Sequence, residues 1–206
     1  GHNVLLVFSM GIFNLFSTIY LTTHQDNFDL MFGAATSSIL SNQLNFAFPI
    51  IGFVGSFLAV PFFASVSSET PFVVILILNT AFVACEMVDN LKAQYVAAFM
   101  FGLVRMFNWA TFYHYISSNP MLYKPHLVGR CLGYNGMMIA IIGDALSPLL
   151  MSYTANGTNP PSKAARYQIL KIFLLFSQLP INILLPWWVR RQRLREPSER
   201  KEGGGF

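Results

Sequence analysis

The chain has 206 residues, of which 54% are hydrophobic and only 11% are charged, and its formal net charge is +4. Soluble domains average about 25% charged residues, so this composition excludes most soluble folds. The two cysteines, Cys85 and Cys131, have no CxxC spacing and no nearby histidine cluster, which argues against a disulfide framework and a zinc site. We expect no bound metal, no cofactor and no nucleic-acid partner.

Six apolar stretches fill the chain almost end to end. A bilayer core about 30 Å thick needs about 20 helical residues to span it. The stretches exceed the length of any barrel strand, and backbone in lipid must satisfy its own hydrogen bonds, so we expect helices. The predicted fold is all-α, with one domain of six transmembrane helices over residues 1–189. The predicted spans are 4–21, 44–66, 71–88, 95–113, 131–153 and 167–189.

Polar or turn-rich segments connect the predicted spans. Residues 22–43 form the longest predicted loop, and the middle of this loop, residues 30–40, is mildly apolar. We expect this middle part either to lie at the membrane interface or to extend the neighbouring helices. Asn119-Pro120 and Lys124-Pro125 are typical turn sequences and mark the fourth connection.

Lysines and arginines are distributed unequally between the two sides that six spans imply. Both termini share one side, and cytosolic segments carry the excess of positive charge. We therefore place both termini on the cytosolic or matrix-like face. The other side holds three cations, Lys92, Lys163 and Arg166. The side with the termini holds eight, namely Lys124, Arg130, Arg190, Arg191, Arg193, Arg195, Arg200 and Lys201.

The last predicted span ends in a membrane anchor. Trp187 and Trp188 stand just before Arg190 and Arg191, so an aromatic anchor meets a basic anchor at the interface. The following tail, residues 190–206, alternates charges and ends near three glycines. We expect this tail to be exposed to solvent, with its first basic turn near lipid headgroups.

Four ionisable residues fall within predicted spans, where each charge costs about 2.5–3.5 kcal/mol on insertion scales. Lys171 lies near the start of its span and can extend to the interface, and Glu86 lies within a turn of a polar loop. Arg105 and Asp144 lie deeper, about 16 Å and about 12 Å from the same side at 1.5 Å per residue. We expect these two to face each other, either as an ion pair that fixes helix packing or as a substrate-binding or gating pair.

Two asparagines mark an expected inner face of the bundle. Asn14 lies in the middle of the first span, and Asn108 lies three residues after Arg105 on the same helical face. They either form interhelical hydrogen bonds, worth about 0.6 kcal/mol on average, or line a polar cavity. The candidate substrate-binding or helix-pairing residues are thus Arg105, Asp144, Asn108 and Asn14. The sequence has no GxSxG, HExxH or Walker motif, so we expect no enzyme.

Residues 99–120 and 128–153 resemble part of a known transporter family. They read FMFGLVRMFNWATFYHYISSNP and VGRCLGYNGMMIAIIGDALSPLLMSY. Six helices with both ends inside are half of a major facilitator transporter, and these residues are similar to the C-terminal half of the large-neutral-amino-acid facilitators and their protist relatives. In that branch an Arg falls in the middle of the fourth helix, a Gly-containing turn opens the fifth, and a Pro breaks it near its end. Arg105, Gly129 to Gly133, and Pro148 stand at those places.

The resemblance implies a transporter that needs a partner. A facilitator site lies between two halves, and the basic turn expected between the second and third helices is absent from residues 65–70. The chain begins Gly1-His2-Asn3 without a methionine, which we interpret as a processed or truncated terminus. These points leave two hypotheses for the function.

The first hypothesis is transport of a small, amino-acid-like solute by a C-terminal facilitator half that another membrane polypeptide completes. The alternative is a non-catalytic structural membrane subunit of a larger complex, for example a mitochondrial respiratory complex, derived from a transporter half. Both hypotheses place the protein in contact with membrane lipid. Transport fits the plasma membrane or an organellar membrane, whereas the alternative fits the mitochondrial inner membrane.

Overall fold

The computed structural model describes residues 2–67, 69–118, 124–156 and 160–202. Within these residues the chain forms six long α-helices and one short 3-10 helix, and it contains no strand. The all-α prediction is therefore confirmed. The elements are α1 (His2–Phe32), α2 (Ala34–Ser65), α3 (Thr70–Glu86), α4 (Leu91–Ser118), η1 (Pro125–Leu127), α5 (Val128–Ala155) and α6 (Pro160–Glu202).

Among the described residues, three segments are long and apolar enough to cross a membrane, Asn3–Phe32, Ala34–Ser65 and Pro125–Ala155. Thr70–Glu86 is a shorter apolar helix. Each of the six predicted spans lies on one of the long helices, and no span extends more than two residues beyond its helix. The helices themselves are longer than most of the spans, as α1 continues to Phe32 and α2 begins at Ala34. That all six helices cross a bilayer stays a prediction.

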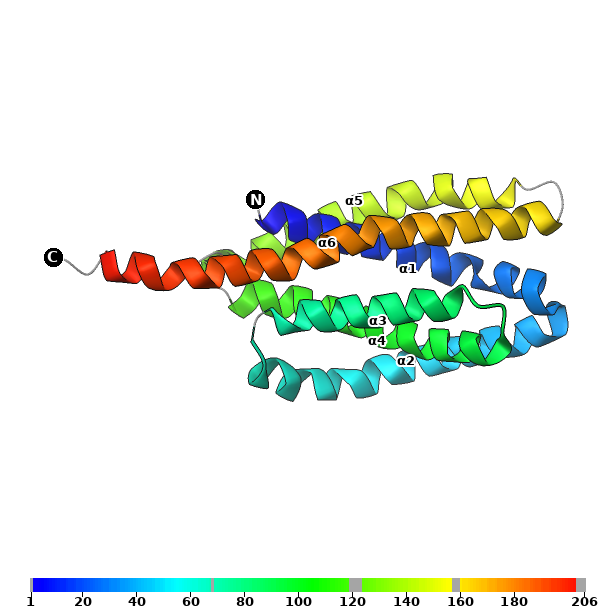
Figure 1. Ribbon diagram of the computed structural model, residues 1–206, viewed down its shortest axis with the longest axis horizontal. Helices are drawn as coiled ribbons and strands as arrows, with labels where there is room; N and C mark the ends of the chain where they lie inside the picture. Colours follow the sequence, from blue (N-terminus) through cyan, green and yellow to red (C-terminus); the bar gives the residue numbers. More distant parts are fainter. Residues whose placement is uncertain (1, 68, 119–123, 157–159, 203–206) are drawn as a thin grey trace.

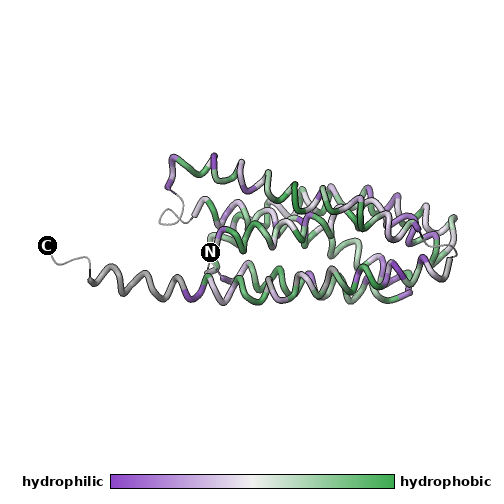
Figure 2. The backbone as a smooth tube through the Cα atoms, turned by 90° about the horizontal axis from the view of Figure 1, so that it is seen from above, coloured by the Kyte–Doolittle hydropathy of each residue, from purple (hydrophilic) through white to green (hydrophobic). Residues whose placement is uncertain are grey.

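The long helices run alternately back and forth along the long axis of the molecule (Figure 1). Both termini lie at the same end, and α6 continues past the other helices there. Hydrophobic residues follow the tubes along most of their length, and hydrophilic residues gather mainly toward the two ends (Figure 2). The backbone of the predicted tail is helical as far as Glu202. Arg190 and Arg191 are exposed, whereas the side chains from residue 192 onward lie outside the described residues.

The predicted long loop over residues 22–43 is wrong, and the extension of the neighbouring helices is correct. α1 and α2 meet at Gly33, whose φ of +80° is a left-handed value that glycine adopts readily. The Gly33 N–H donates to the carbonyl oxygen of Asp29 at 3.1 Å, which satisfies the end of α1. The Ser37 hydroxyl donates to the carbonyl oxygen of Gln25 at 3.1 Å. These bonds fold α2 back against α1.

Pro148 does not break the fifth helix as the resemblance implied. It lies inside α5, which continues to Ala155. Gly129 and Gly133 lie in the first turns of the same helix. The missing N–H of a proline costs one hydrogen bond per site, and the helix continues across it.

α1 and α4 occupy the centre of the bundle. α1 packs along α5 and α6, and α4 packs along α2 and α3, while α3 also contacts α6. The most apolar part of α1 is 61% buried, against 11% for α2 and 17% for the α5 segment. α2 and α5 therefore leave most of their apolar surface uncovered.

The two halves of the chain pack as repeats of each other. α1 packs on α5 as α4 packs on α2, and α1 packs on α6 as α4 packs on α3. Ile142 lies against the backbone of Gly11, where a Cβ would be 2.8 Å from the Ile142 Cβ, and Ile51 lies in the same way against Gly102. One shift of 91 residues takes Gly11 to Gly102 and Ile51 to Ile142.

The sequence carries a trace of this repeat. Ile-Ile-Gly-x-x-x-Ser occurs at 50–56 and again at 141–147, at the same shift of 91 residues. Because each repeat holds three helices, the second repeat runs in the opposite direction along the bundle. The two repeats therefore have the inverted topology that is common in transporter folds.

Candidate functional site

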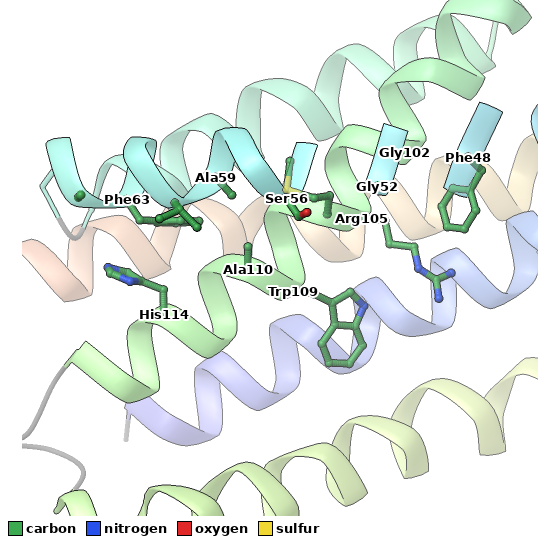
Figure 3. A pocket seen from close by; sticks show the side chains of 13 residues that line it. Phe48, Gly52, Ser56, Ala59, Phe63, Gly102, Arg105, Trp109, Ala110 and His114 are labelled. Carbon is green, nitrogen blue, oxygen red and sulfur yellow. The ribbon is translucent and has the colours of Figure 1, made fainter. Parts of the chain in front are cut away.

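An apolar pocket of about 640 Å³ lies between α2 and α4 (Figure 3). Its size is in the range of small-molecule sites, about 300–1,000 Å³. Small side chains of both helices open it, and aromatic side chains form much of its wall. The lining residues used below are Phe48, Phe63, Gly52, Arg105, Trp109 and His114.

Arg105 carries the charge of this pocket. Its guanidinium carbon lies 5.2 Å from the centre of the Phe48 ring, which is a cation–π contact. Figure 3 shows both side chains at one end of the pocket, with Phe63 and His114 at the other end. Arg105 is half-buried, and among the residues that the structure describes no carboxylate forms an ion pair with it. The guanidinium thus faces an apolar site without an anionic partner from this part of the chain.

His114 closes the opposite end of the pocket, just beyond the predicted span 95–113. Its ring stacks on Phe63, with the ring centres 4.8 Å apart. Partial burial lowers the pKa of the His114 imidazole below its ordinary value, because burial disfavours the charged form. The positive charge of the pocket therefore rests on Arg105.

Asp144 pairs α5 with α1. The Asn14 amide donates to Asp144 Oδ1 at 3.1 Å, and the Thr18 hydroxyl lies 3.4 Å from the same oxygen. Gly143 permits this approach, because a Cβ there would lie 2.9 Å from the Asn14 Cβ. Asn14 and Asp144 thus join α1 to α5 by a hydrogen bond, whereas the sequence interpretation had paired Asp144 with Arg105.

The structure does not bring Arg105 and Asp144 together, so the expected ion pair is wrong. Arg105 faces Phe48 on α2, and Asp144 faces Asn14 on α1. Similar depth along two consecutive helices does not fix the rotation of each helix about its axis. Here the rotation turns the two charges toward different neighbours.

The internal repeat relates the surroundings of Arg105 to those of Asp144. The shift of 91 residues takes Asn14 to Arg105 and Phe53 to Asp144. At the crossing of α1 with α5, an amide meets a carboxylate. At the equivalent crossing of α4 with α2, an arginine takes the place of the amide and a phenylalanine takes the place of the carboxylate. The chain therefore puts a cation where its own repeat supplies no anion.

Asn108 does not join Arg105 in the pocket. Its amide donates to the Val104 carbonyl of the same helix at 2.9 Å, and the side chain is buried. It lines a separate small cavity with Leu6 and Phe72. The Asn108 amide therefore finds its hydrogen-bond acceptor within α4, on the side of the helix that faces α1 and α3.

The predicted membrane anchor is ordered by ring contacts on α6. The Arg191 guanidinium lies 5.3 Å from the centre of the Trp187 ring, and Trp187 contacts Trp188 edge to face. Trp187 is exposed and Trp188 is partly buried. The position of this membrane anchor at a lipid interface stays a prediction.

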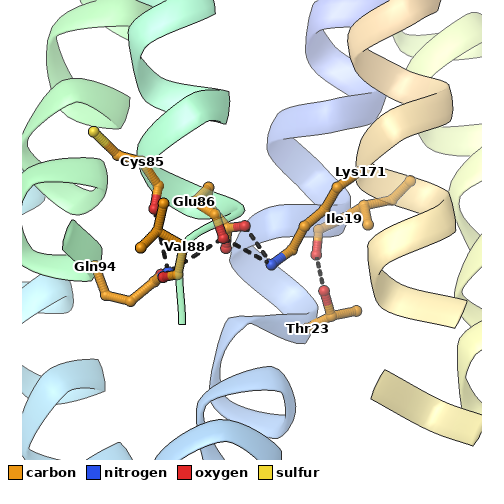
Figure 4. Close-up of polar contacts among 7 residues, drawn as sticks. All are labelled: Ile19, Thr23, Cys85, Glu86, Val88, Gln94 and Lys171. Carbon is orange, nitrogen blue, oxygen red and sulfur yellow. Dashed lines mark hydrogen bonds and ion pairs between the residues drawn. The ribbon is translucent and has the colours of Figure 1, made fainter. Parts of the chain in front are cut away.

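A buried ion pair lies where sequence reasoning had expected two unrelated interfacial residues. Glu86 of α3 pairs with Lys171 of α6, with side chains only 3% and 12% exposed (Figure 4). The Lys171 ammonium also donates to the Glu86 carbonyl oxygen at 3.2 Å. The sequence could have indicated this pair, because Glu86 lies near the end of its predicted span and Lys171 near the start of its own, which places both at the same end of the bundle. The packing of α3 against α6 then buries them together.

Gln94 of α4 completes this polar joint. Its amide donates to the carbonyl oxygens of Glu86 at 3.2 Å and Val88 at 2.9 Å (Figure 4). The last carbonyls of a helix have no partner within the helix. Side chains from α4 and α6 therefore close the end of α3.

Within the described residues, no group of three or more His, Cys, Asp and Glu side chains could hold a metal ion. Comparison with known protein families, with curated proteins and with solved structures finds no match.

Proposed function

We propose that the protein is a membrane-transport subunit that forms the C-terminal half of a solute facilitator of the major facilitator type. Another membrane polypeptide supplies the second half, and the solute is small and amino-acid-like. The membrane is the plasma membrane or that of an organelle. The observation that carries this proposal is the guanidinium of Arg105, which has no anionic partner among the described residues and lies in the apolar pocket between α2 and α4.

The chemistry of the solute follows from Arg105. A cation held among apolar side chains needs an anionic partner, since an uncompensated charge is costly in such surroundings. Guanidinium and carboxylate form two parallel hydrogen bonds, which gives both strength and orientation. A solute carboxylate fits this partner, and the aromatic and small residues of the pocket fit an apolar body attached to it.

Two further observations support a half of a larger transporter. The helices form inverted repeats, which are common in facilitators. α2 and α5 leave most of their apolar surface uncovered, and large exposed apolar surfaces mark contacts with lipid or with other proteins. A second set of helices against α2 and α5 would cover this surface and enclose the Arg105 pocket.

The test is uptake by the native complex. The complex would be purified through a tag on this chain, and its partner polypeptide would be identified by mass spectrometry. The purified complex would then be reconstituted into liposomes. Uptake of radiolabelled apolar amino acids would then be compared for wild type, Arg105→Gln and the exposed control Arg130→Gln. A hydrogen bond to a charged group is worth about 1.5–3 kcal/mol, so we expect uptake to fall by about 10- to 100-fold in Arg105→Gln alone.

Complex yield must stay the same in both variants for this result to count. Equal uptake by Arg105→Gln and wild type would contradict the role of Arg105. A wild-type complex that binds and transports no solute, while loss of this chain disrupts a larger assembly, would contradict transport itself and support the structural-subunit alternative.

A further inference from the structure

A small cavity lies behind the Glu86–Lys171 pair, between α1, α3 and α6. Its volume is about 30 Å³. α1 contributes Tyr20, His24 and Asn27 to its lining, and the spacing of these residues places them on one face of the helix. The cavity shares no lining residue with the Arg105 pocket.

Three buried polar atoms line this cavity without a protein partner among the described residues. They are Tyr20 Oη, His24 Nε2 and Asn27 Nδ2. Their side chains are 6%, 8% and 5% exposed, respectively. Buried polar groups are almost always hydrogen-bonded, and each one left without a partner costs about 1–3 kcal/mol. Three such atoms on one cavity indicate a ligand that this part of the chain does not supply.

The hydrogen-bonding roles of these atoms are complementary. His24 Nδ1 lies 2.8 Å from the carbonyl oxygen of Leu21, and a carbonyl only accepts, so Nδ1 carries the proton. Nε2 of the neutral ring is then an acceptor. The Asn27 amide nitrogen is a donor, and the Tyr20 hydroxyl can do either. The ligand must therefore both donate and accept.

The volume of the cavity and the charges beside it restrict the size and the charge of the ligand. A water molecule needs roughly 10–15 Å³ of such space and two to four polar partners, so the cavity holds one or two waters and nothing much larger. Glu86 and Lys171 already neutralise each other. A small cation would add charge beside the Lys171 ammonium, and an anion would add charge beside the Glu86 carboxylate. The ligand is therefore neutral.

We propose that this cavity binds a structural water molecule. The water donates to His24 Nε2, accepts from Asn27 Nδ2 and exchanges a hydrogen bond with Tyr20 Oη. All three hydrogen bonds go to α1, so the water satisfies the polar groups that α1 turns toward the cavity behind the Glu86–Lys171 pair.

The test compares Tyr20→Phe with Tyr113→Phe in the full chain, purified with its native partners. Tyr113 is 51% exposed, so its hydroxyl is a matched control that should change nothing. If water fills the cavity, Tyr20→Phe removes one of its three partners and lowers the thermal midpoint by about 2–4 °C, as expected for a chain of this size. If the cavity is dry, the same change removes an unsatisfied hydroxyl and raises the midpoint.

A second measurement keeps the proposal testable if Tyr20→Phe fails to fold. A cryo-electron microscopy map of the wild-type complex that resolves waters should show a peak within hydrogen-bonding distance of Tyr20 Oη, His24 Nε2 and Asn27 Nδ2. An unchanged or raised thermal midpoint in Tyr20→Phe, or a map without that peak, would overturn the proposal.

Discussion

Replacement of Lys171 by methionine should destabilise the bundle strongly. Lys171 is the counter-ion of Glu86, which is 3% exposed, and it also donates to the carbonyl oxygen at the end of α3. Methionine has a similar length but leaves the carboxylate uncompensated. The main loss falls on the contact between α3 and α6.

The magnitude follows from the burial of the pair. Removal of one partner of a buried ion pair costs about 3–5 kcal/mol, whereas replacement of both partners by neutral groups of similar size is often close to neutral. We therefore expect about 3–5 kcal/mol for Lys171→Met. Most of this loss should return in the double variant Glu86→Gln/Lys171→Met, because no charge then remains buried.

The assay is denaturant unfolding of the purified complex in lipid–detergent micelles, followed by tryptophan fluorescence. Lys92→Met serves as the control, because Lys92 is exposed and should lose less than about 1 kcal/mol. The reasoning is refuted if Lys171→Met costs no more than this control. It is also refuted if the double variant is no more stable than Lys171→Met.

Two further predictions use the same preparation, and a third uses intact vesicles. In a double-mutant cycle, the coupling energy between Arg105→Ala and Asp144→Ala should be zero to within about 0.3–0.5 kcal/mol. A coupling energy above about 1 kcal/mol would show that the two charged side chains interact. Gly143→Ala should lower the free energy of unfolding by about 1–3 kcal/mol, because the new methyl group would be overpacked against α1. Gly52→Ala at the equivalent position has nothing within 4 Å of the new Cβ and should leave the stability unchanged or raise it. Equal effects of the two substitutions would contradict the close approach of α1 at Gly143. Cys131 lies at the end that holds the termini, so an impermeant thiol reagent added outside intact vesicles should not label it, and strong labelling would reverse the predicted orientation.

Part of the candidate site was predictable because a charge in an apolar helix is visible in the sequence. Arg105 and Asp144 were found in this way, and Asn14 proved to be the partner of Asp144. The pairing of Arg105 with Asp144 was not predictable from depth. Both helices are apolar on every side, so no amphipathic pattern indicates which face turns inward.

The internal repeat also could not be interpreted from the sequence alone. Ile-Ile-Gly-x-x-x-Ser recurs in the sequence at 50–56 and 141–147, but so short a pattern acquires meaning only when Gly11 and Gly102 are seen to receive the two isoleucines. Only then does Arg105 stand out as the residue that takes the place of an amide and that faces Phe48 without a carboxylate partner in the described part of the chain.

The sequence by itself did not determine where the helices end, since α1 and α2 continue to Gly33. It did determine the six helical segments and the gathering of basic residues at one end. Uniform hydropathy over about 20 residues suffices for this, because backbone hydrogen bonds within a helix are local. The tertiary structure decided the contacts between helices, such as the turn at Gly33 and the burial of Glu86 against Lys171. These contacts depend on the rotation and close approach of neighbouring helices, which small residues and single polar side chains fix, and which the apolar composition of the spans leaves open.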